Sequence, residues 1–355
     1  MCCMRSVAGG TDLRKLLNVL YVTSPDAYLA CENQNVAVRL AGEVKVRLPI
    51  HTLEGIVAFG HCGASPALMA LCAESGVALT FLNDHGRFMA RVVGQVSGNV
   101  LLRRKQYRLA DSAEQSRQIA ANFIVGKIAN SRTVLLRAAR DHEESIQSEP
   151  VRAAAAELAD RMRLVENCKT LDDLRGVEGS AASQYFGAFD HLILANKDEF
   201  YLRDRNRRPP RDNMNAMLSF LYSLLAHDVE SALETVGLDP QVGFLHRDRP
   251  GRPSLALDLM EEVRPVLADR LALALVNRRQ VSPRGFLETE SGGVLMDDAT
   301  RKTVITAWQT RKREEIVHPY LNVKIEVGLI PHVQALLLAR LLRGDLDGYP
   351  PFFWK

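Results

Sequence analysis

The sequence has no long apolar run, no CxxC cysteine pair and no glycine-rich nucleotide-binding loop. No apolar stretch among its 355 residues reaches the roughly 20 residues of a membrane-spanning helix, and the start lacks the apolar core of a secretion signal. The six cysteines are scattered without a CxxC pair, which excludes a zinc ribbon and a disulfide framework and is typical of buried thiols. Neither a Walker-type phosphate loop nor a GxGxxG motif occurs. We therefore expect a cytoplasmic protein without these nucleotide-binding sites.

A large charge of either sign is also absent. The formal net charge is +3, with 45 Lys and Arg against 42 Asp and Glu, so composition alone predicts no nucleic-acid partner. Basic residues nevertheless cluster in four segments, which are 101–108, 203–211, 246–252 and 277–279. Such clusters are usually solvated faces, but they indicate phosphate binding if several converge on one groove.

The pattern of the chain changes near residue 100, which predicts an α+β protein of two domains. Before this point short β-rich runs alternate with turn residues, and "NDHG" at 83–86 is typical of a hairpin. A helix interrupts them, with Ser65 as its N-cap. After this point long segments show helical spacing. We expect an amino-terminal extension (1–14), a small β-domain (15–103) and a larger all-helical domain (104–355).

The chain closes with the aromatic tail "YPPFFWK" after a helix predicted at 331–344. Pro350 and Pro351 exclude a helix in the tail, which carries four aromatic side chains. Exposed aromatic residues require a covering surface. The tail either packs on its own domain or docks on another protein.

The segment "GFLHRDRPGRPSLALDLMEE" (243–262) places a histidine before a helical run of acids. On a helix, Asp258 shares a face with Glu261 and Glu262, which lie three and four residues later. Like charges repel, so a cation must compensate them. The candidates are the nearby arginines, including Arg249, or a divalent metal to which His246 adds a nitrogen ligand. The spacing does not distinguish Glu261 from Glu262.

Two further segments contain candidate polar residues. Glu178 lies between two glycines in "GVEG" and is either catalytic or an ordinary acid in the first turn of a helix. Asn215 and Tyr222 are seven residues apart, so they share one helix face, either beside a site or as a polar pair on a core helix.

Taken together, these segments resemble a known family. "LRGVEGSAASQYF", "NRRPPRDNMNAMLSFLYSLL" and "VGFLHRDRPGRPSLALDLMEEVRP" are similar to motifs of the CRISPR adaptation integrase, a metal-dependent Cas DNA endonuclease, and the similarity is closest to subtype I-C. The resemblance covers roughly residues 15–355. It implies that the β-domain (15–103) serves for dimerisation and that the helical domain (104–355) is catalytic. It implies Glu178, His246 and Glu261 as catalytic residues and ligands of Mg²⁺ or Mn²⁺, with Asp258 as a supporting acid. Asn215 and Tyr222 would then lie around the site.

The same resemblance implies DNA and protein partners. The substrates would be short double-stranded prespacer DNA and the branched DNA formed at the CRISPR leader-repeat. The partners would be a second copy of the chain, a small ferredoxin-like Cas protein that bridges two dimers and an iron–sulfur Cas nuclease that trims DNA ends. The arginines expected to contact DNA phosphates are Arg103, Arg104, Arg207, Arg208, Arg211, Arg247 and Arg252. A catalytically idle DNA-binding scaffold and a general repair nuclease are the alternatives.

Overall fold

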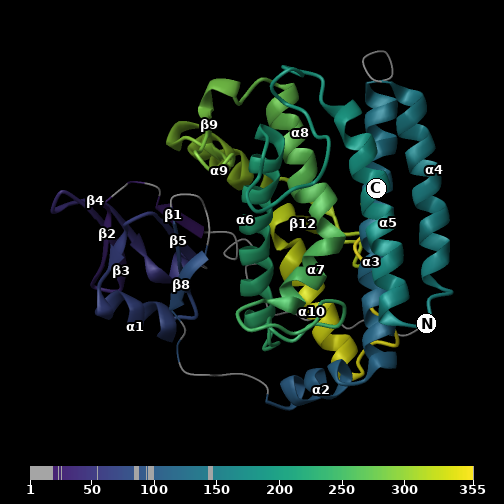
Figure 1. Ribbon diagram of the computed structural model, residues 1–355. Coiled ribbons are helices and arrows are strands. Elements are labelled where there is room, and N and C mark those ends of the chain that lie inside the picture. The colour runs from purple at the N-terminus through teal and green to yellow at the C-terminus, as the bar shows by residue number, and fades with distance from the viewer. Residues whose placement is uncertain are drawn as a thin grey trace. The chain divides into compact units, whose positions relative to one another are not determined.

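The computed structural model describes residues 19–354 except 23, 25, 54, 84–87, 93, 95–99 and 143–146. The chain divides into a β unit, residues 1–83 with 88–95, and a helical unit, residues 84–87 with 96–355 (Figure 1). The predicted α+β class is confirmed. The expected boundary at 103/104 falls inside the first helix of the helical unit. The expected extension 1–14 and turn residues 84–86 lie outside the described residues.

The β unit contains two four-stranded sheets. In the first, the strand order is β1-β5-β7-β8, with β8 antiparallel to β7 and the other pairs parallel. In the second, the order is β4-β3-β2-β6, with only the β2–β6 pair parallel. The strands are β1 (Val19–Val22), β2 (Tyr28–Glu32), β3 (Asn35–Leu40), β4 (Glu43–Pro49), β5 (Gly55–Phe59), β6 (Gly63–Ala64), β7 (Ala78–Leu82) and β8 (Phe88–Val92). The antiparallel β7–β8 pair confirms the predicted hairpin.

One helix, α1 (Pro66–Glu74), packs on the β unit. It begins where the sequence predicts, since Ser65 Oγ accepts the N–H of Leu68 at 3.2 Å. Leu68 and Cys72 are fully buried in the core shared with both sheets, beside Leu29 and Ile56. This apolar core holds the two sheets and the helix together.

The helical unit consists of nine described helices of the α type and two small hairpins. The helices are α2 (Val100–Ala110), α3 (Ala113–Asp141), α4 (Ser148–Val165), α5 (Leu171–Phe189), α6 (Asn213–Thr235), α7 (Ser254–Arg264), α8 (Arg270–Asn277), α9 (Asp298–Lys312) and α10 (Ile330–Arg343). The hairpins pair β9 (Phe286–Glu288) with β10 (Val294–Met296) and β11 (Glu315–Val317) with β12 (Lys324–Glu326). No helix in the described part of the chain is long and apolar enough to cross a membrane.

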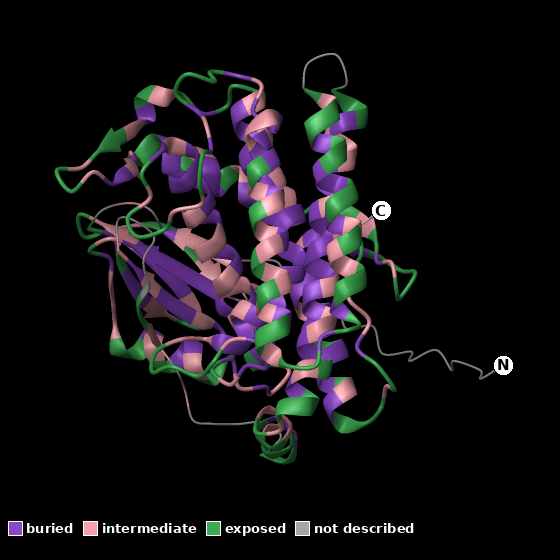
Figure 2. Ribbon diagram, turned by 45° about the vertical axis from the view of Figure 1, so that its right-hand side comes forward, coloured by how far each residue is buried: buried purple, intermediate pink, exposed green. Residues whose placement is uncertain are grey.

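Helix α3 is in contact with several other helices of its unit. It is 29 residues long, which corresponds to about 43 Å, and packs against α4, α5 and α7. Figure 2 shows that the buried residues of these helices lie where the helices meet. Its Gly126 allows a close approach, because an added Cβ would lie 2.9 Å from Cβ of Glu262 on α7 and 3.2 Å from Cβ of Pro351. The sequence therefore fixes how near α7 and the tail come to α3.

Helices α7 and α8 form one continuous helix with a π-helical segment, Pro265–Asp269, between them. Pro265 has no backbone N–H, so an α-helical hydrogen bond is missing at this point. A π turn then changes the directions in which the following side chains point. Asp269 at the end of this segment is buried and contacts residues of α5 and α6.

The aromatic tail packs on its own helical unit, which is one of the two predicted alternatives. Its Tyr349 hydroxyl donates a hydrogen bond to Glu262 Oε1, and its Phe352 N–H donates to Glu262 Oε2 at 3.1 Å. Gln334 Nε2 donates to the same carboxylate at 3.0 Å. Asn130 Nδ2 on α3 donates to the Phe352 carbonyl at 2.7 Å. The tail is thus tied to α3, α7 and α10.

Replacement of Tyr349 by Phe tests this attachment. The variant deletes one donor to the buried Glu262 carboxylate, and we expect the free energy of unfolding to fall by about 1–2 kcal/mol. Chemical denaturation measures the loss. Tyr320→Phe is the matched control because Tyr320 is 51% exposed, and it should leave stability unchanged. Equal stability of both variants would show that the tail does not depend on this bond.

Candidate functional site

Three helices bring two acids to one lysine. Lys127 Nζ on α3 lies 2.7 Å from Glu261 Oε2 on α7 and also forms an ion pair with Glu178 Oε1 on α5. The Lys127 side chain is 6% exposed, that of Glu261 is 8% exposed and that of Glu178 is 27% exposed. Two of the three predicted ligands therefore converge, and Lys127 supplies the cation between them.

Glu261 is strongly biased towards its ionised form. Burial acts to raise its pKa, but the charges of Arg264 and Lys127 outweigh this effect and lower the pKa to about 2. His246 adds a weaker contribution in the same direction, so its ring is near this carboxylate. The Arg264 guanidinium forms an ion pair with Glu261 Oε2. The site thus holds a buried carboxylate that stays charged at any physiological pH.

Asp258 fixes the segment that carries His246. The fully buried carboxylate of Asp258 accepts the backbone N–H groups of Phe244, Leu245 and His246 at 2.6, 2.9 and 3.0 Å. Its Oδ1 also lies 2.6 Å from His246 Nδ1. Gly243 makes room for this arrangement, since an added Cβ would lie 2.7 Å from Asp258 Oδ2. Asp258 contacts Nδ1 of the His246 ring, so Nε2 is the ring nitrogen that this carboxylate does not contact.

Glu178 lies within α5 and is not a capping residue. The helix begins at Leu171, with Thr170 and Asp173 forming the capping box, so Glu178 is about two turns inside. The interpretation as a first-turn acid is therefore wrong. The glycines around Glu178 in the sequence suggested a helix start, but Gly176 and Gly179 lie inside a continuous helix.

The start of α5 is tied to the histidine segment. Arg175 donates two hydrogen bonds to the Leu245 carbonyl, at 3.1 Å from Nε and 2.6 Å from Nη2. Arg247 Nη2 lies 3.3 Å from Asp172 Oδ1. These contacts hold α5, and with it Glu178, beside the segment that carries His246.

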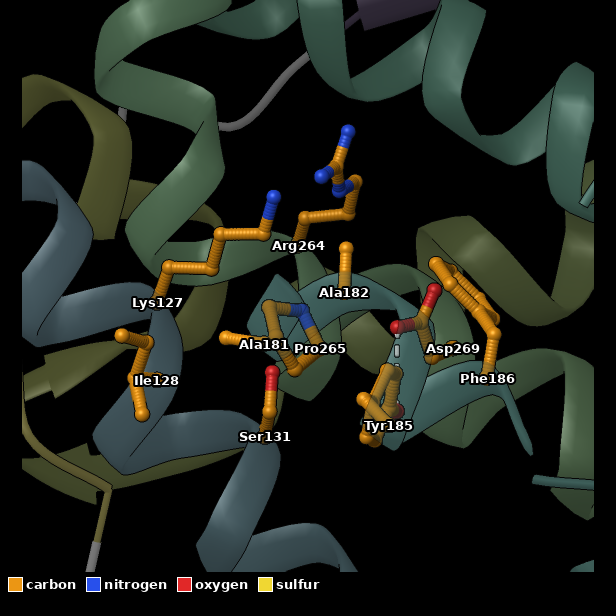
Figure 3. A pocket seen from close by; sticks show the side chains of 10 residues that line it. All are labelled: Lys127, Ile128, Ser131, Ala181, Ala182, Tyr185, Phe186, Arg264, Pro265 and Asp269. Carbon is orange, nitrogen blue, oxygen red and sulfur yellow. Dashed lines mark hydrogen bonds between the residues drawn. The ribbon is translucent and has the colours of Figure 1, made fainter. Parts of the chain in front are cut away.

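A second polar network supports Arg264. Asp269 accepts hydrogen bonds from the hydroxyls of Tyr185 at 3.0 Å and Tyr222 at 2.6 Å. The Arg264 guanidinium carbon lies 4.9 Å from the centre of the Tyr222 ring. Figure 3 shows the nitrogen ends of Lys127 and Arg264 on the same side of the cavity, apart from the Tyr185–Asp269 pair. This cavity, about 10 Å³, holds at most one water molecule and is no substrate pocket.

Asn215 contacts this network through an arginine. Its Oδ1 accepts from Arg205 Nη1 at 2.6 Å, and the Arg205 guanidinium carbon also lies 4.9 Å from the Tyr222 ring centre. Asn215 Nδ2 donates to Asp204 and Asp212. Tyr222 thus contacts Arg264, the arginine paired with Glu261, whereas Asn215 contacts Arg205. Among the described residues, no hydrogen bond that we observe joins either side chain to Glu178.

Two of the predicted basic clusters lie next to each other. Burial lowers the pKa of Arg252, and repulsion from Arg249, Arg207 and Arg208 lowers it further, while Asp258 opposes them. Arg207, Arg208 and Arg249 are exposed. The loops 203–211 and 246–252 therefore form one basic surface beside the Asp258–His246 pair.

The remaining predicted arginines are placed as follows. Arg211 and Arg247 are exposed and belong to the same two loops. Arg103 and Arg104 lie on α2, a helix that Gln106 ties to the carbonyls of residues 239 and 242. Their expected phosphate contacts stay predictions.

Glu178, Glu261 and His246 are residue types that bind divalent metals. In this structure the two carboxylates pair with the Lys127 ammonium instead. Within the residues that the structure describes, no three His, Cys, Asp or Glu side chains are arranged so that they could hold a metal ion. Glu178 and Glu261 offer oxygen ligands and His246 Nε2 offers nitrogen, a set that fits Mg²⁺ or Mn²⁺. A carboxylate on the other ring nitrogen, as Asp258 provides, is typical of histidine ligands. By residue type this set suits the ion that the resemblance implies, although the side chains are not arranged around a metal position here.

Sequence reasoning missed Lys127 and Arg264. Lys127 stands in "FIVGKIANS", at a position where the apolar face of α3 continues with Phe123, Ile124 and Ile128, all buried. A lysine on an apolar helix face requires a buried partner, and this was the available signal.

Replacement of Asp258 by Ala should be strongly destabilising. It removes the acceptor of three buried backbone N–H groups, so we expect a loss of about 3 kcal/mol or more in the free energy of unfolding. Asp160→Ala, which removes an exposed carboxylate paired with Arg163, should change little. Denaturation of both variants compares them. A wild-type midpoint for Asp258→Ala would mean that the segment 244–246 is held by other contacts.

Known proteins resemble this chain over nearly its whole length. A family model described as CRISPR associated protein Cas1 matches residues 20–310. CRISPR-associated endonuclease Cas1 1 of Chlorobaculum tepidum is 49% identical over 343 residues, which are 97% of this chain and 100% of the relative. CRISPR-associated endonuclease Cas1 2 of Rhodospirillum rubrum is 51% identical over 347 residues, with the same shares covered. A solved CAS1 protein from Thermotoga maritima shares the fold, with a TM-score of 0.80 at 23% identity over 94% of this chain and 99% of that one. The chain belongs to the Cas1 family of CRISPR-associated proteins.

Proposed function

We propose that the protein is a metal-dependent DNA integrase and endonuclease of CRISPR adaptation. It joins the 3′-hydroxyl ends of short prespacer DNA to the CRISPR repeat by phosphodiester transesterification. The sequence motifs support a position nearest to subtype I-C. The relatives named CRISPR-associated endonucleases support chemistry on phosphodiester bonds.

The observation that carries this proposal is the convergence of Glu178 and Glu261 on one cation beside His246. Two acids this close together, one of them buried, need a positive charge between them. Lys127 provides it here, and a divalent ion is the cation that would serve catalysis in the same place.

The chain's own residues prepare the site for this ion. Glu178 and Glu261 would hold it through carboxylate oxygens and His246 through Nε2. Asp258 accepts from Nδ1 of His246 and so keeps the ring proton on that nitrogen, which leaves the Nε2 lone pair for a ligand. When bound, the ion polarises the scissile phosphodiester and stabilises the charge on its oxygens.

The DNA and its protein partners belong to the same proposal. The basic surface of loops 203–211 and 246–252 would hold DNA phosphates next to the site, without reading base edges. The chain would form a homodimer, join a small ferredoxin-like Cas protein that bridges two dimers and receive DNA ends trimmed by an iron–sulfur Cas nuclease. These partners rest on the resemblance of the sequence motifs.

A strand-transfer assay tests the proposal. A supercoiled plasmid carrying a repeat array is incubated with short duplex DNA ending in 3′-hydroxyls, in Mn²⁺, in Mg²⁺ or in EDTA. We expect joined products in metal and none in EDTA. Equal joining in EDTA contradicts metal dependence. DNA binding without any cleavage or joining identifies a scaffold, and cleavage of branched DNA without preference for the repeat identifies a repair nuclease.

His246→Ala should separate catalysis from DNA binding. Removal of the imidazole deletes one proposed ligand but leaves the arginines of the basic surface, so strand transfer should fall at least about 100-fold. Affinity for branched DNA should stay within about twofold of wild type. Both quantities are measured on the same folded preparation. Integration at the wild-type rate would exclude His246 as a ligand.

Lys127→Met should strengthen metal binding in the absence of DNA. If the ion takes the position of the ammonium, the variant no longer has a cation to displace, and Mn²⁺ affinity measured by calorimetry should rise roughly tenfold, which is about 1.4 kcal/mol. Lys312→Met is the matched control, since Lys312 is 7% exposed and pairs with Asp228 elsewhere. Unchanged affinity in Lys127→Met would contradict a shared position.

A further inference from the structure

A basic groove lies between α8 and α9, apart from the candidate site. Its volume is about 780 Å³, within the range of pockets that hold ligands. Four cationic side chains line it, and one lining acid, Glu314, forms an ion pair with Arg311. The cations are Arg270 and Arg278 from α8 and its end, and Lys302 and Arg311 from α9. The groove therefore keeps a surplus of positive charge.

The tail tryptophan gathers three guanidiniums at this groove. The guanidinium carbons of Arg270 and Arg311 each lie 5.3 Å from the centre of the Trp354 ring, and that of Arg137 lies 5.7 Å from it. Such stacking holds each cation individually but does not cancel repulsion among them. Burial lowers the pKa of Arg270 to about 10, and the charges of Arg311 and Arg137 contribute to the shift. Arg270 and Arg311, which both line the groove, are thus held close together with their positive charges.

Three side chains of this cluster carry N–H groups without an acceptor. Arg270 Nη1, Arg311 Nη2 and Trp354 Nε1 are buried and have no hydrogen-bond partner in the described part of the chain. Buried donors without acceptors are costly. An acceptor that enters the groove, with a small shift of the guanidiniums, would satisfy those of Arg270 and Arg311, which line it.

We propose that this groove binds the phosphodiester backbone of a DNA strand. The inference rests on the proposed function, because it takes DNA as the substrate. It adds a second region of DNA contact to the basic surface of loops 203–211 and 246–252. Arg137 and Lys127 are ten residues apart on α3, so the groove lies about 15 Å along that helix from the candidate catalytic site. A strand held here extends beyond the reacting phosphate.

The arrangement of the cations fits a strand. Arg270 and Arg278 are eight residues apart, so about 12 Å separates their positions along the helix. A duplex presents a phosphate for each roughly 3.4 Å of axis on each strand, so such cations match phosphates three or four nucleotides apart. The hydroxyls of Thr303, Thr306 and Thr310 donate to backbone carbonyls and offer no donor to a ligand. The cations thus dominate binding, which should be tolerant of sequence.

The double variant Arg278→Gln with Lys302→Gln tests the groove. Both side chains are exposed, so the fold should be kept. Affinity for a short DNA duplex is measured at several KCl concentrations, without divalent metal. We expect the slope of log affinity against log salt to become shallower by about 0.9 for each phosphate that the variant no longer neutralises. Arg163→Gln with Lys169→Gln removes the same charges from exposed positions at the end of α4, and it should keep the wild-type slope.

A second pair of variants tests the role of the tryptophan. Trp354→Ala removes the ring that gathers the arginines and should weaken DNA binding several-fold, whereas Trp354→Phe keeps a ring and should weaken it less. The native fold of each is checked by circular dichroism. Equal affinity of both variants and wild type counts against the proposal.

The outcomes separate this inference from the proposed function. If wild type binds no DNA at any salt concentration, the proposed function fails and the groove proposal fails with it. If wild type binds with a steep salt slope that the groove double variant shares, the groove proposal alone fails, and an acidic protein becomes the better occupant. If both double variants reduce the slope equally, the effect is one of general charge and the groove proposal is also overturned.

Discussion

The ion pairs between Lys127 and the carboxylates of Glu178 and Glu261 constrain the whole helical unit. The Lys127 side chain is 6% exposed and its ammonium pairs with both acids, so α3, α5 and α7 meet within hydrogen-bond distance of one point. Gly126, next to Lys127, permits the approach of α7 that this requires. The positions of Glu178 and Glu261 are therefore a consequence of how three helices pack. His246 comes from a loop, and Asp258 holds that loop and the imidazole ring in place.

Adjacent residues on α7 serve two separate networks. Side chains one position apart on a helix point about 100° apart, so Glu261 faces Lys127 and Arg264 while Glu262 faces the tail. Burial raises the pKa of Glu262 to about 7, and donors from Tyr349, Phe352 and Gln334 act against that rise. Both carboxylate oxygens of Glu262 accept hydrogen bonds from groups of the protein itself. Helix spacing alone could not distinguish Glu261 from Glu262, because both lie within about one turn of Asp258. Their partners from distant segments distinguish them.

Much of the fold follows from local signals in the sequence. The N-cap at Ser65, the hairpin strands β7 and β8 and the change to helical spacing near residue 100 depend on neighbours in the chain, and each is found. The role of Glu178 depends on depth instead. Its flanking glycines resembled a helix start, yet α5 begins at Leu171, since the capping box at Thr170 decides the boundary. Lys127 was overlooked because sequence periodicity shows on which face of a helix a residue lies, but not which other segments pack on that face.

The tail connects the two regions of charge in the helical unit. Phe352 is bound through Asn130 and Glu262, and the backbone N–H of Trp354 donates to Asn130 Oδ1 at 2.8 Å, so the ring of Trp354 is placed by the same residues that hold α3 against α7. The π-helical segment at Pro265 then determines which way Asp269 and Arg270 point, one towards the tyrosines around Arg264 and the next towards Trp354. A change in this segment or in the tail would therefore disturb both the candidate catalytic site and the basic groove, because one set of backbone contacts positions the charges of each.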